Sequence, residues 1–172
     1  AICEWEARDI VGHNAHLNPQ PSTYKPPVGT GLWQPTAPDF GKALFPYMGN
    51  SRYFALKGAE QLALHPLPYS ENFNSDLFKQ AEEVFTRTNA VNQRTPSAYE
   101  DRWIAEFWSD DLINLTFSPT SRLLSIANQT VSREKLNLAE CAELYAKLGM
   151  ALNDAGTATW KSKYHYNVER PI

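Results

Sequence analysis

Two side chains near the end of the chain, Lys163 and Arg170, have the types and the spacing to bind an oxyanion that carries several charges. An arginine fork can grip two oxygens of such an ion, while a lysine ammonium supplies a point charge on a flexible stem. In a helix, at about 100° per residue, seven residues bring both side chains within about 20° of one face. Trp160 falls on the same face, whereas Lys161 points elsewhere. The spacing therefore predicts one anion-binding wall with a tryptophan beside it.

The basic residues at this helix end can also be explained without any binding or catalytic role. Basic side chains near the C-terminus of a helix complement its macrodipole, and they are expected there in any helical protein. Pro171 disfavours helical dihedral angles at Arg170, so the helix is predicted to end at Glu169 with the arginine at its exit. Spacing alone leaves both interpretations open.

The elements that must position these residues are predicted to be helices. Residues 75–87 place apolar side chains on one face behind Ser75, a favoured capping residue. The segment "TPSAYEDRWIAEFWSDD" at 95–111 has a heavy aromatic stripe, and Pro119 marks a further helix start. Asn137 with Glu140 three residues later forms a capping-box pattern that opens the last helix. No stretch alternates convincingly at period two, so the fold class is predicted to be all-α.

The segment 18–56 differs, because seven prolines between Asn18 and Pro46 interrupt any regular element. Aromatic residues recur through it, so it is predicted to be an irregular strap that is pinned to the helical body by rings. Residues 1–17 are compatible with a short amphipathic helix. We expect one α-helical domain over 1–172, with the helices at 75–169.

Composition excludes several classes of protein. The 172 residues carry a net charge of -3, so no global positive field draws in nucleic acid. No run of about eighteen apolar residues exists, so no membrane span is expected. Cys3 and Cys141 could form a disulfide or remain two thiols, and the sequence leaves this open. His13 and His16 lack carboxylates nearby, so no metal ligand is expected directly from this chain.

The segment from Lys163 to Pro171 reads K-x-x-x-x-x-x-R-P, and more of the chain follows the same pattern. It resembles the first signature of the superfamily that joins type 2 phosphatidic acid phosphatases, bacterial acid phosphatases and vanadium-dependent haloperoxidases. The helix and exit "LNDAGTATWKSKYHYNVERPI", the segment "RWIAEFWSDD" and the strap "GLWQPTAPDFGKALFPYMGNSRYFAL" are similar to the bacterial haloperoxidase-like branch. The resemblance covers most of the chain from Tyr24 onward.

The resemblance implies roles for individual residues. The signature lysine, here Lys163, would bond an equatorial oxygen of bound vanadate or phosphate and, in haloperoxidases, polarise bound peroxide. The signature arginine, here Arg170, would bind the same anion, and Trp160 would form a pocket wall. The implied activity is a vanadate-dependent haloperoxidase that oxidises a halide with hydrogen peroxide. The alternatives are an acid phosphatase with the same cradle and a non-catalytic relic of the fold.

The chain also departs from that superfamily. A Ser-Gly-His run and a second arginine followed by a histidine should lie downstream of the first signature, and the sequence contains neither. We therefore expect the N-terminal part of a longer haloperoxidase-like domain, with the rest of the site on the remainder of the same enzyme or on a companion chain. Residues 1–172 alone are expected to be inactive. A secreted or periplasmic location is also expected.

Overall fold

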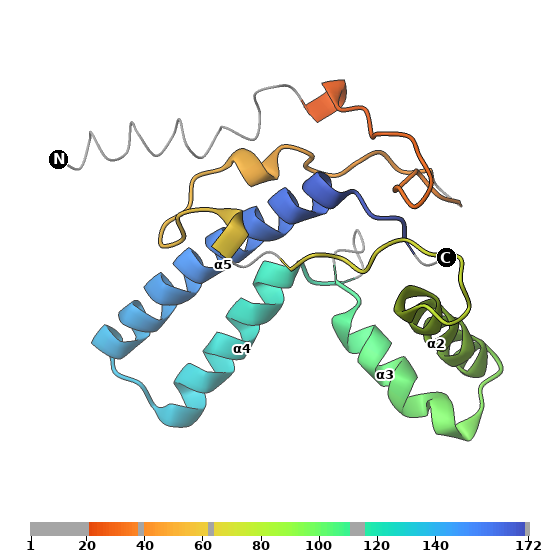
Figure 1. Ribbon diagram of the computed structural model, residues 1–172. Helices are drawn as coiled ribbons and strands as arrows, with labels where there is room; N and C mark the ends of the chain where they lie inside the picture. The colour runs from red at the N-terminus through yellow and green to blue at the C-terminus, as the bar shows by residue number, and fades with distance from the viewer. Residues whose placement is uncertain (1–20, 38–39, 62–63, 111–115, 171–172) are drawn as a thin grey trace. The chain divides into compact units, whose positions relative to one another are not determined.

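The computed structural model describes residues 21–37, 40–61, 64–110 and 116–170, and within these ranges it is helical (Figure 1). Its four α-helices are α2 (Asp76–Asn92), α3 (Tyr99–Trp108), α4 (Pro119–Glu134) and α5 (Leu138–Tyr166). The described residues form no strand, so the all-α prediction is confirmed. No helix in this part of the chain combines the length and the apolar character needed to cross a bilayer. The predicted helix at 1–17, Cys3, His13 and His16 lie outside the described residues.

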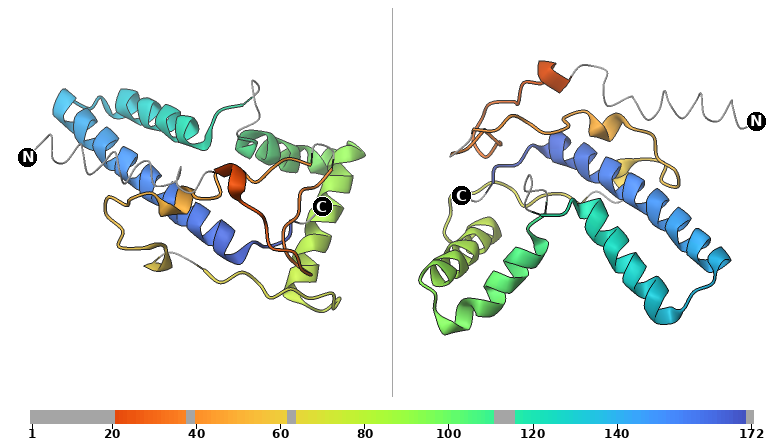
Figure 2. Two further views of the ribbon diagram at one scale, coloured as in Figure 1. Left: turned by 90° about the horizontal axis from the view of Figure 1, so that it is seen from above. Right: turned by 180° about the vertical axis from the view of Figure 1, so that it is seen from behind.

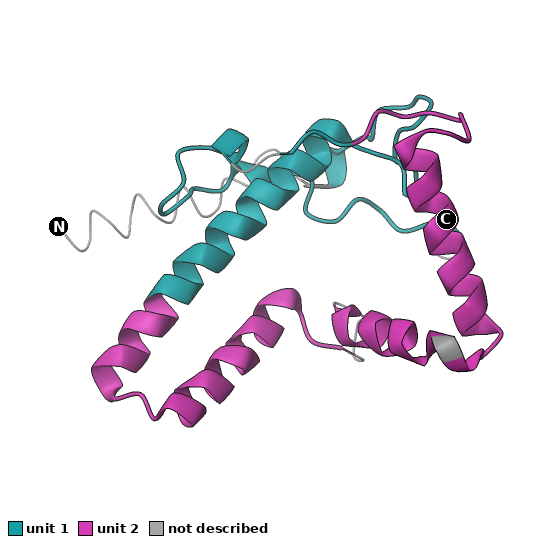
Figure 3. Ribbon diagram, turned by 60° about the horizontal axis from the view of Figure 1, so that its bottom comes forward, with its two compact units in different colours: residues 1–66, 147–170, 172 teal, residues 67–146, 171 magenta. Residues whose placement is uncertain are grey.

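The chain separates into two compact units (Figure 3). Unit 1 comprises residues 1–66 and 147–170, and unit 2 comprises residues 67–146. Helix α5 contributes to both, because its first part belongs to unit 2 and the rest to unit 1.

Local signals set the helix starts of unit 2. The Ser75 hydroxyl accepts a hydrogen bond from the Phe78 amide at 3.2 Å, and α2 runs beyond the predicted stretch to Asn92. Pro119 occupies the first turn of α4, as its fixed φ angle favours. At the start of α5, the Glu140 carboxylate accepts from the Asn137 amide at 2.8 Å, and the Asn137 side chain accepts from the Glu140 amide at 3.1 Å. The predicted capping box is therefore confirmed.

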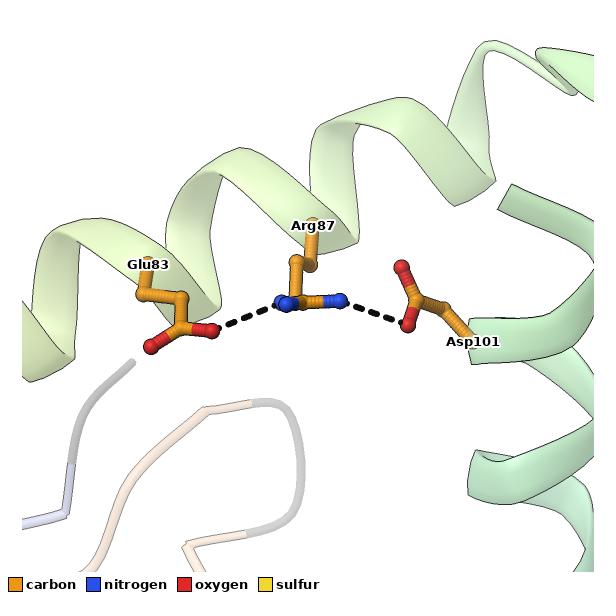
Figure 4. Close-up of polar contacts among 3 residues, drawn as sticks. All are labelled: Glu83, Arg87 and Asp101. Carbon is orange, nitrogen blue, oxygen red and sulfur yellow. Dashed lines mark hydrogen bonds and ion pairs between the residues drawn. The ribbon is translucent and has the colours of Figure 1, made fainter. Parts of the chain in front are cut away.

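Unit 2 also contains polar links between helices and a large exposed aromatic surface. Arg87 on α2 bonds Glu83 one turn earlier at 2.9 Å and Asp101 on α3 at 2.8 Å (Figure 4). The predicted aromatic stripe does not form a core among the described residues, because Trp103 remains 69% exposed and Trp108 63% exposed.

In unit 1, the strap lies along the C-terminal half of α5, as Figures 1 and 2 both show for the turn at Met48–Asn50. Between residues 21 and 61 the described chain contains only three single 3-10 turns, at Pro21–Thr23, Met48–Asn50 and Ala59–Gln61. At Gly49 the strap backbone approaches the helix so closely that a Cβ atom there would lie 2.6 Å from the Cα of Lys161. Only glycine fits this crossing without a shift of one backbone.

Asp154 anchors the strap to α5. Its carboxylate is 4% exposed and accepts hydrogen bonds from three consecutive strap amides, those of Phe54 at 2.7 Å, Ala55 at 2.7 Å and Leu56 at 2.9 Å. Burial raises the pKa of Asp154, but these bonds favour the ionised form more strongly, and the net pKa is lowered. Asp154 thus has a structural role, because it holds the strap against α5.

Helix α5 ends at Tyr166, three residues before the predicted end at Glu169. Asn167 adopts a left-handed conformation with φ of 47°, which asparagine tolerates better than most residues. Val168 then forms an antiparallel bridge with Leu32 of the strap. The prediction from Pro171 was wrong because this pairing with a distant segment ends the helix first.

Candidate functional site

A cavity of about 610 Å³ opens in unit 1 at the C-terminal end of α5. Its lining comes from the C-terminal part of α5 and its exit, from the strap, and from Leu64 and Pro66. Its polar lining includes three basic side chains, those of Lys42, Lys163 and Arg170. The described lining residues include no aspartate or glutamate.

Lys163 and Arg170 line this same cavity, although the helical geometry that predicted their proximity does not apply. Arg170 lies four residues beyond the end of α5, so its position is set by the chain that follows the helix. There the Trp33 amide donates to the Asn167 carbonyl at 2.9 Å, and the Glu169 amide donates to the Gly31 carbonyl at 3.0 Å. This pairing with the strap directs Arg170 to the cavity.

Burial and the charge of Arg170 both act on the protonation of Lys163. Lys163 remains partly open to solvent, yet burial of its ammonium group lowers its pKa, and the charge of Arg170 lowers that pKa further. Within the described residues, neither side chain forms an ion pair with a carboxylate. A nearby anion would relieve the repulsion between them.

Aromatic rings flank Lys163. Its Nζ atom lies 5.2 Å from the centroid of the Trp160 ring and 5.5 Å from that of Tyr164. At these distances the faces of the rings stabilise the charged ammonium. The rings therefore favour the protonated form of Lys163, which is the form that can bind an anion.

Trp160 is not among the residues that line the cavity, although it was predicted as a pocket wall. It contacts two residues that do line it. Its Nε1 donates to the Leu44 carbonyl at 3.1 Å, and its ring lies against Lys163. Trp160 therefore contacts the cavity lining without being part of it.

Sequence reasoning missed Lys42 and Asn167. Lys42 belongs to the strap, and no motif or spacing relates it to α5. Asn167 lines the cavity and is 5% exposed, and its Nδ2 has no hydrogen-bond partner among the described residues. Its position in the K-x-x-x-x-x-x-R-P pattern could have drawn attention to it, but the sequence gives no sign of its burial.

The donor set fits an oxyanion better than a metal cation. Ammonium and guanidinium groups donate hydrogen bonds to oxygens and repel cations. The described residues contain no group of three or more histidine, cysteine, aspartate or glutamate side chains that could hold a metal ion. Vanadate or phosphate therefore matches the chemistry of this cavity.

The chain is similar in structure to a known enzyme. No family model matches the chain, and no curated protein does. Among solved structures, the chain is similar to a bacterial vanadium-dependent iodoperoxidase, with a TM-score of 0.80 and 27% sequence identity. The match covers 99% of this chain and 40% of the iodoperoxidase chain. The chain therefore has a haloperoxidase-like fold and spans less than half the length of that relative.

Proposed function

We propose that this chain supplies the first part of the oxyanion site of a vanadate-dependent haloperoxidase. The observation that carries the proposal is the convergence of Lys163 and Arg170 on one cavity without a partner carboxylate among the described residues. The similarity to a vanadium-dependent iodoperoxidase supports the choice of vanadate as the anion.

Each side chain has a distinct task in this proposal. Arg170 holds two oxygens of the anion through its planar fork, which fixes the orientation of the ion. Lys163 places a charge on another oxygen, and Trp160 and Tyr164 keep that ammonium oriented. When bound, vanadate would activate hydrogen peroxide for the two-electron oxidation of a halide.

The rest of the site would come from the remainder of the same enzyme or from a companion chain. This part of the proposal rests on the absence of the two downstream signatures and on the 40% coverage of the iodoperoxidase. Residues 1–172 alone should then show no turnover, because the histidine that bonds vanadium or attacks phosphorus in the superfamily would be absent.

Activity of the full-length protein tests the proposal. We expect halide oxidation by hydrogen peroxide to rise with added vanadate and to saturate. Lys163→Ala should lower turnover at limiting vanadate about tenfold or more, because it removes a charge-assisted hydrogen bond. Lys161→Ala is the matched control, since Lys161 lies two residues earlier in α5 and does not line the cavity.

The same assay separates the alternatives. Hydrolysis of a phosphate ester that vanadate inhibits, without halide oxidation, would replace the peroxidase by an acid phosphatase. Neither activity in the full-length protein, with no effect of vanadate, would favour a non-catalytic relic of the fold.

A further inference from the structure

We propose that Lys42 is a third anion-binding side chain of this cavity and that two hydrogen bonds from α5 to the Leu44 carbonyl hold it there. The inference rests on the proposed function, because it takes the ligand to be a multiply charged oxyanion. It extends the site from α5 to the strap.

Lys42 is placed to add a third positive charge to the cavity. Lys42 lines the same cavity as Lys163 and Arg170, and it is exposed to solvent. No ion pair joins Lys42 to a carboxylate of the described residues. The other strap lysine, Lys25, does not line the cavity. The strap therefore brings one of its cations to the two on the helix side.

Helix α5 fixes the strap close to Lys42. The Leu44 carbonyl accepts hydrogen bonds from Trp160 Nε1 at 3.1 Å and from the Tyr164 hydroxyl at 2.5 Å. Trp160 and Tyr164 lie one helical turn apart and flank Lys163. Because two residues of extended chain span about 7 Å at most, the anchored carbonyl confines the Lys42 backbone to the same region. The stretch of α5 that carries Lys163 thus also positions Lys42.

The backbone around Lys42 has an unusual conformation that agrees with such anchoring. Phe40 and Phe45, on either side of Gly41–Leu44, have positive φ angles of 46° and 50°. Bulky side chains rarely adopt these angles, which persist where the surroundings impose them. The two hydrogen bonds to the Leu44 carbonyl, next to Phe45, are such a constraint.

Three cations favour a ligand with more than one negative charge. A single halide can neutralise one of them, whereas a dianionic or trianionic tetrahedral oxyanion offers several oxygens to all three. Because Lys42 is exposed, its contribution should be electrostatic and should weaken as salt screens it. We therefore assign Lys42 to capture and retention of the oxyanion, with inorganic phosphate as the simplest probe.

Calorimetric titration of the full-length protein with inorganic phosphate at low ionic strength tests the assignment. Lys42→Gln should raise the dissociation constant about fivefold, as loss of one exposed charge implies. Lys42→Arg should bind within about twofold of the wild-type protein, because it keeps the charge. Lys25→Gln removes the same charge from the strap away from the cavity and should leave the dissociation constant unchanged. Raising the salt concentration should reduce the Lys42→Gln effect.

The positioning role of the Leu44 carbonyl has its own test. Tyr164→Phe removes one hydrogen bond to that carbonyl and keeps the ring, so it should raise the phosphate dissociation constant about threefold. In a Lys42→Gln background the same change should have almost no further effect, because the lysine that it positions is gone. An equal effect in both backgrounds would overturn the positioning role.

The outcomes separate this inference from the proposed function. Wild-type phosphate affinity in Lys42→Gln, with affinity lost in Lys163→Ala, would overturn the role of Lys42 and leave the two-cation site in place. If each of the three single variants, Lys42→Gln, Lys163→Ala and Arg170→Lys, bound phosphate with wild-type affinity, the proposed function itself would be overturned.

Discussion

The polar contacts inside unit 1 and those inside unit 2 differ in how far apart in the sequence their residues lie. In unit 2 the ion pairs and hydrogen bonds join residues close in the chain, such as Arg87 with Asp101, which are 14 residues apart. In unit 1 the strap and α5 are joined by bonds between residues about a hundred apart, such as Phe54 with Asp154 and Leu44 with Trp160. The cavity and its cations lie in unit 1. The candidate site therefore depends on contacts between residues far apart in the sequence, whereas unit 2 depends on contacts between residues close in the sequence.

The largest effect is expected from Asp154→Ala in unit 1. The substitution removes the buried carboxylate that accepts from three strap amides, and because hydrogen bonds to a charged group are strong, the free energy of unfolding should fall by about 3 kcal/mol or more. Urea denaturation of the purified protein measures this. The control is Asp101→Ala in unit 2, whose partner Arg87 lies at the surface, and its effect should be far smaller. Equal losses would contradict the contrast between the units.

Gly49→Ala tests the close crossing of the strap over α5. The added methyl group would meet the backbone of Lys161, so the free energy of unfolding should fall by about 1–3 kcal/mol. Gly149→Ala is the matched control, because a Cβ atom there meets nothing within 4 Å and alanine favours the helix. A neutral Gly49→Ala would mean that the strap does not lie so close to the helix in solution.

Acid should weaken unit 1 through Asp154. Its pKa in the folded protein lies below the ordinary value of 3.8, so the ionised carboxylate stabilises the fold. This contribution is complete well above pH 3.8 and is lost as the pH falls through the lower pKa of the folded state. Asp154→Asn should lack this acid-dependent part. The measurement is unfolding free energy against pH from 7 down to about 3 for both proteins. Parallel curves would show that Asp154 does not titrate with folding.

The smallest effect is expected at the capping box of unit 2. Glu140→Ala removes the side chain that accepts from the Asn137 amide, and the free energy of unfolding should fall by about 0.5–1 kcal/mol. Glu140→Gln retains an acceptor and should lie closer to the wild-type protein. A loss from Glu140→Ala as large as that from Asp154→Ala would show that local signals matter as much as long-range bonds.

The same difference in range explains what the sequence could predict. Ser75, Pro119 and the Asn137 cap carry their signals within four residues, so the helix starts and the all-α class follow from local chemistry. The end of α5 could not be predicted, because the bridge between Val168 and Leu32 depends on a segment 136 residues away. No pattern in the sequence reports such a pairing.

The candidate site combines both kinds of information. Lys163 and Arg170 were singled out by spacing and by resemblance, and the structure brings both to one cavity without the continuous helix that the spacing assumed. Lys42 could not be predicted, because its place depends on the strap conformation and on the bonds at Leu44. The three amide partners of Asp154 could not be predicted either, because they follow only from the path of the strap.

We propose that Lys163 and Arg170 hold one oxyanion in this cavity, and a crystal structure of the full-length protein grown with vanadate would show whether they do. We expect density for the anion at the C-terminal end of α5, with oxygens within about 3.2 Å of Lys163 Nζ and of the Arg170 guanidinium. Vanadate bound elsewhere, or held in the cavity without either side chain, would contradict it.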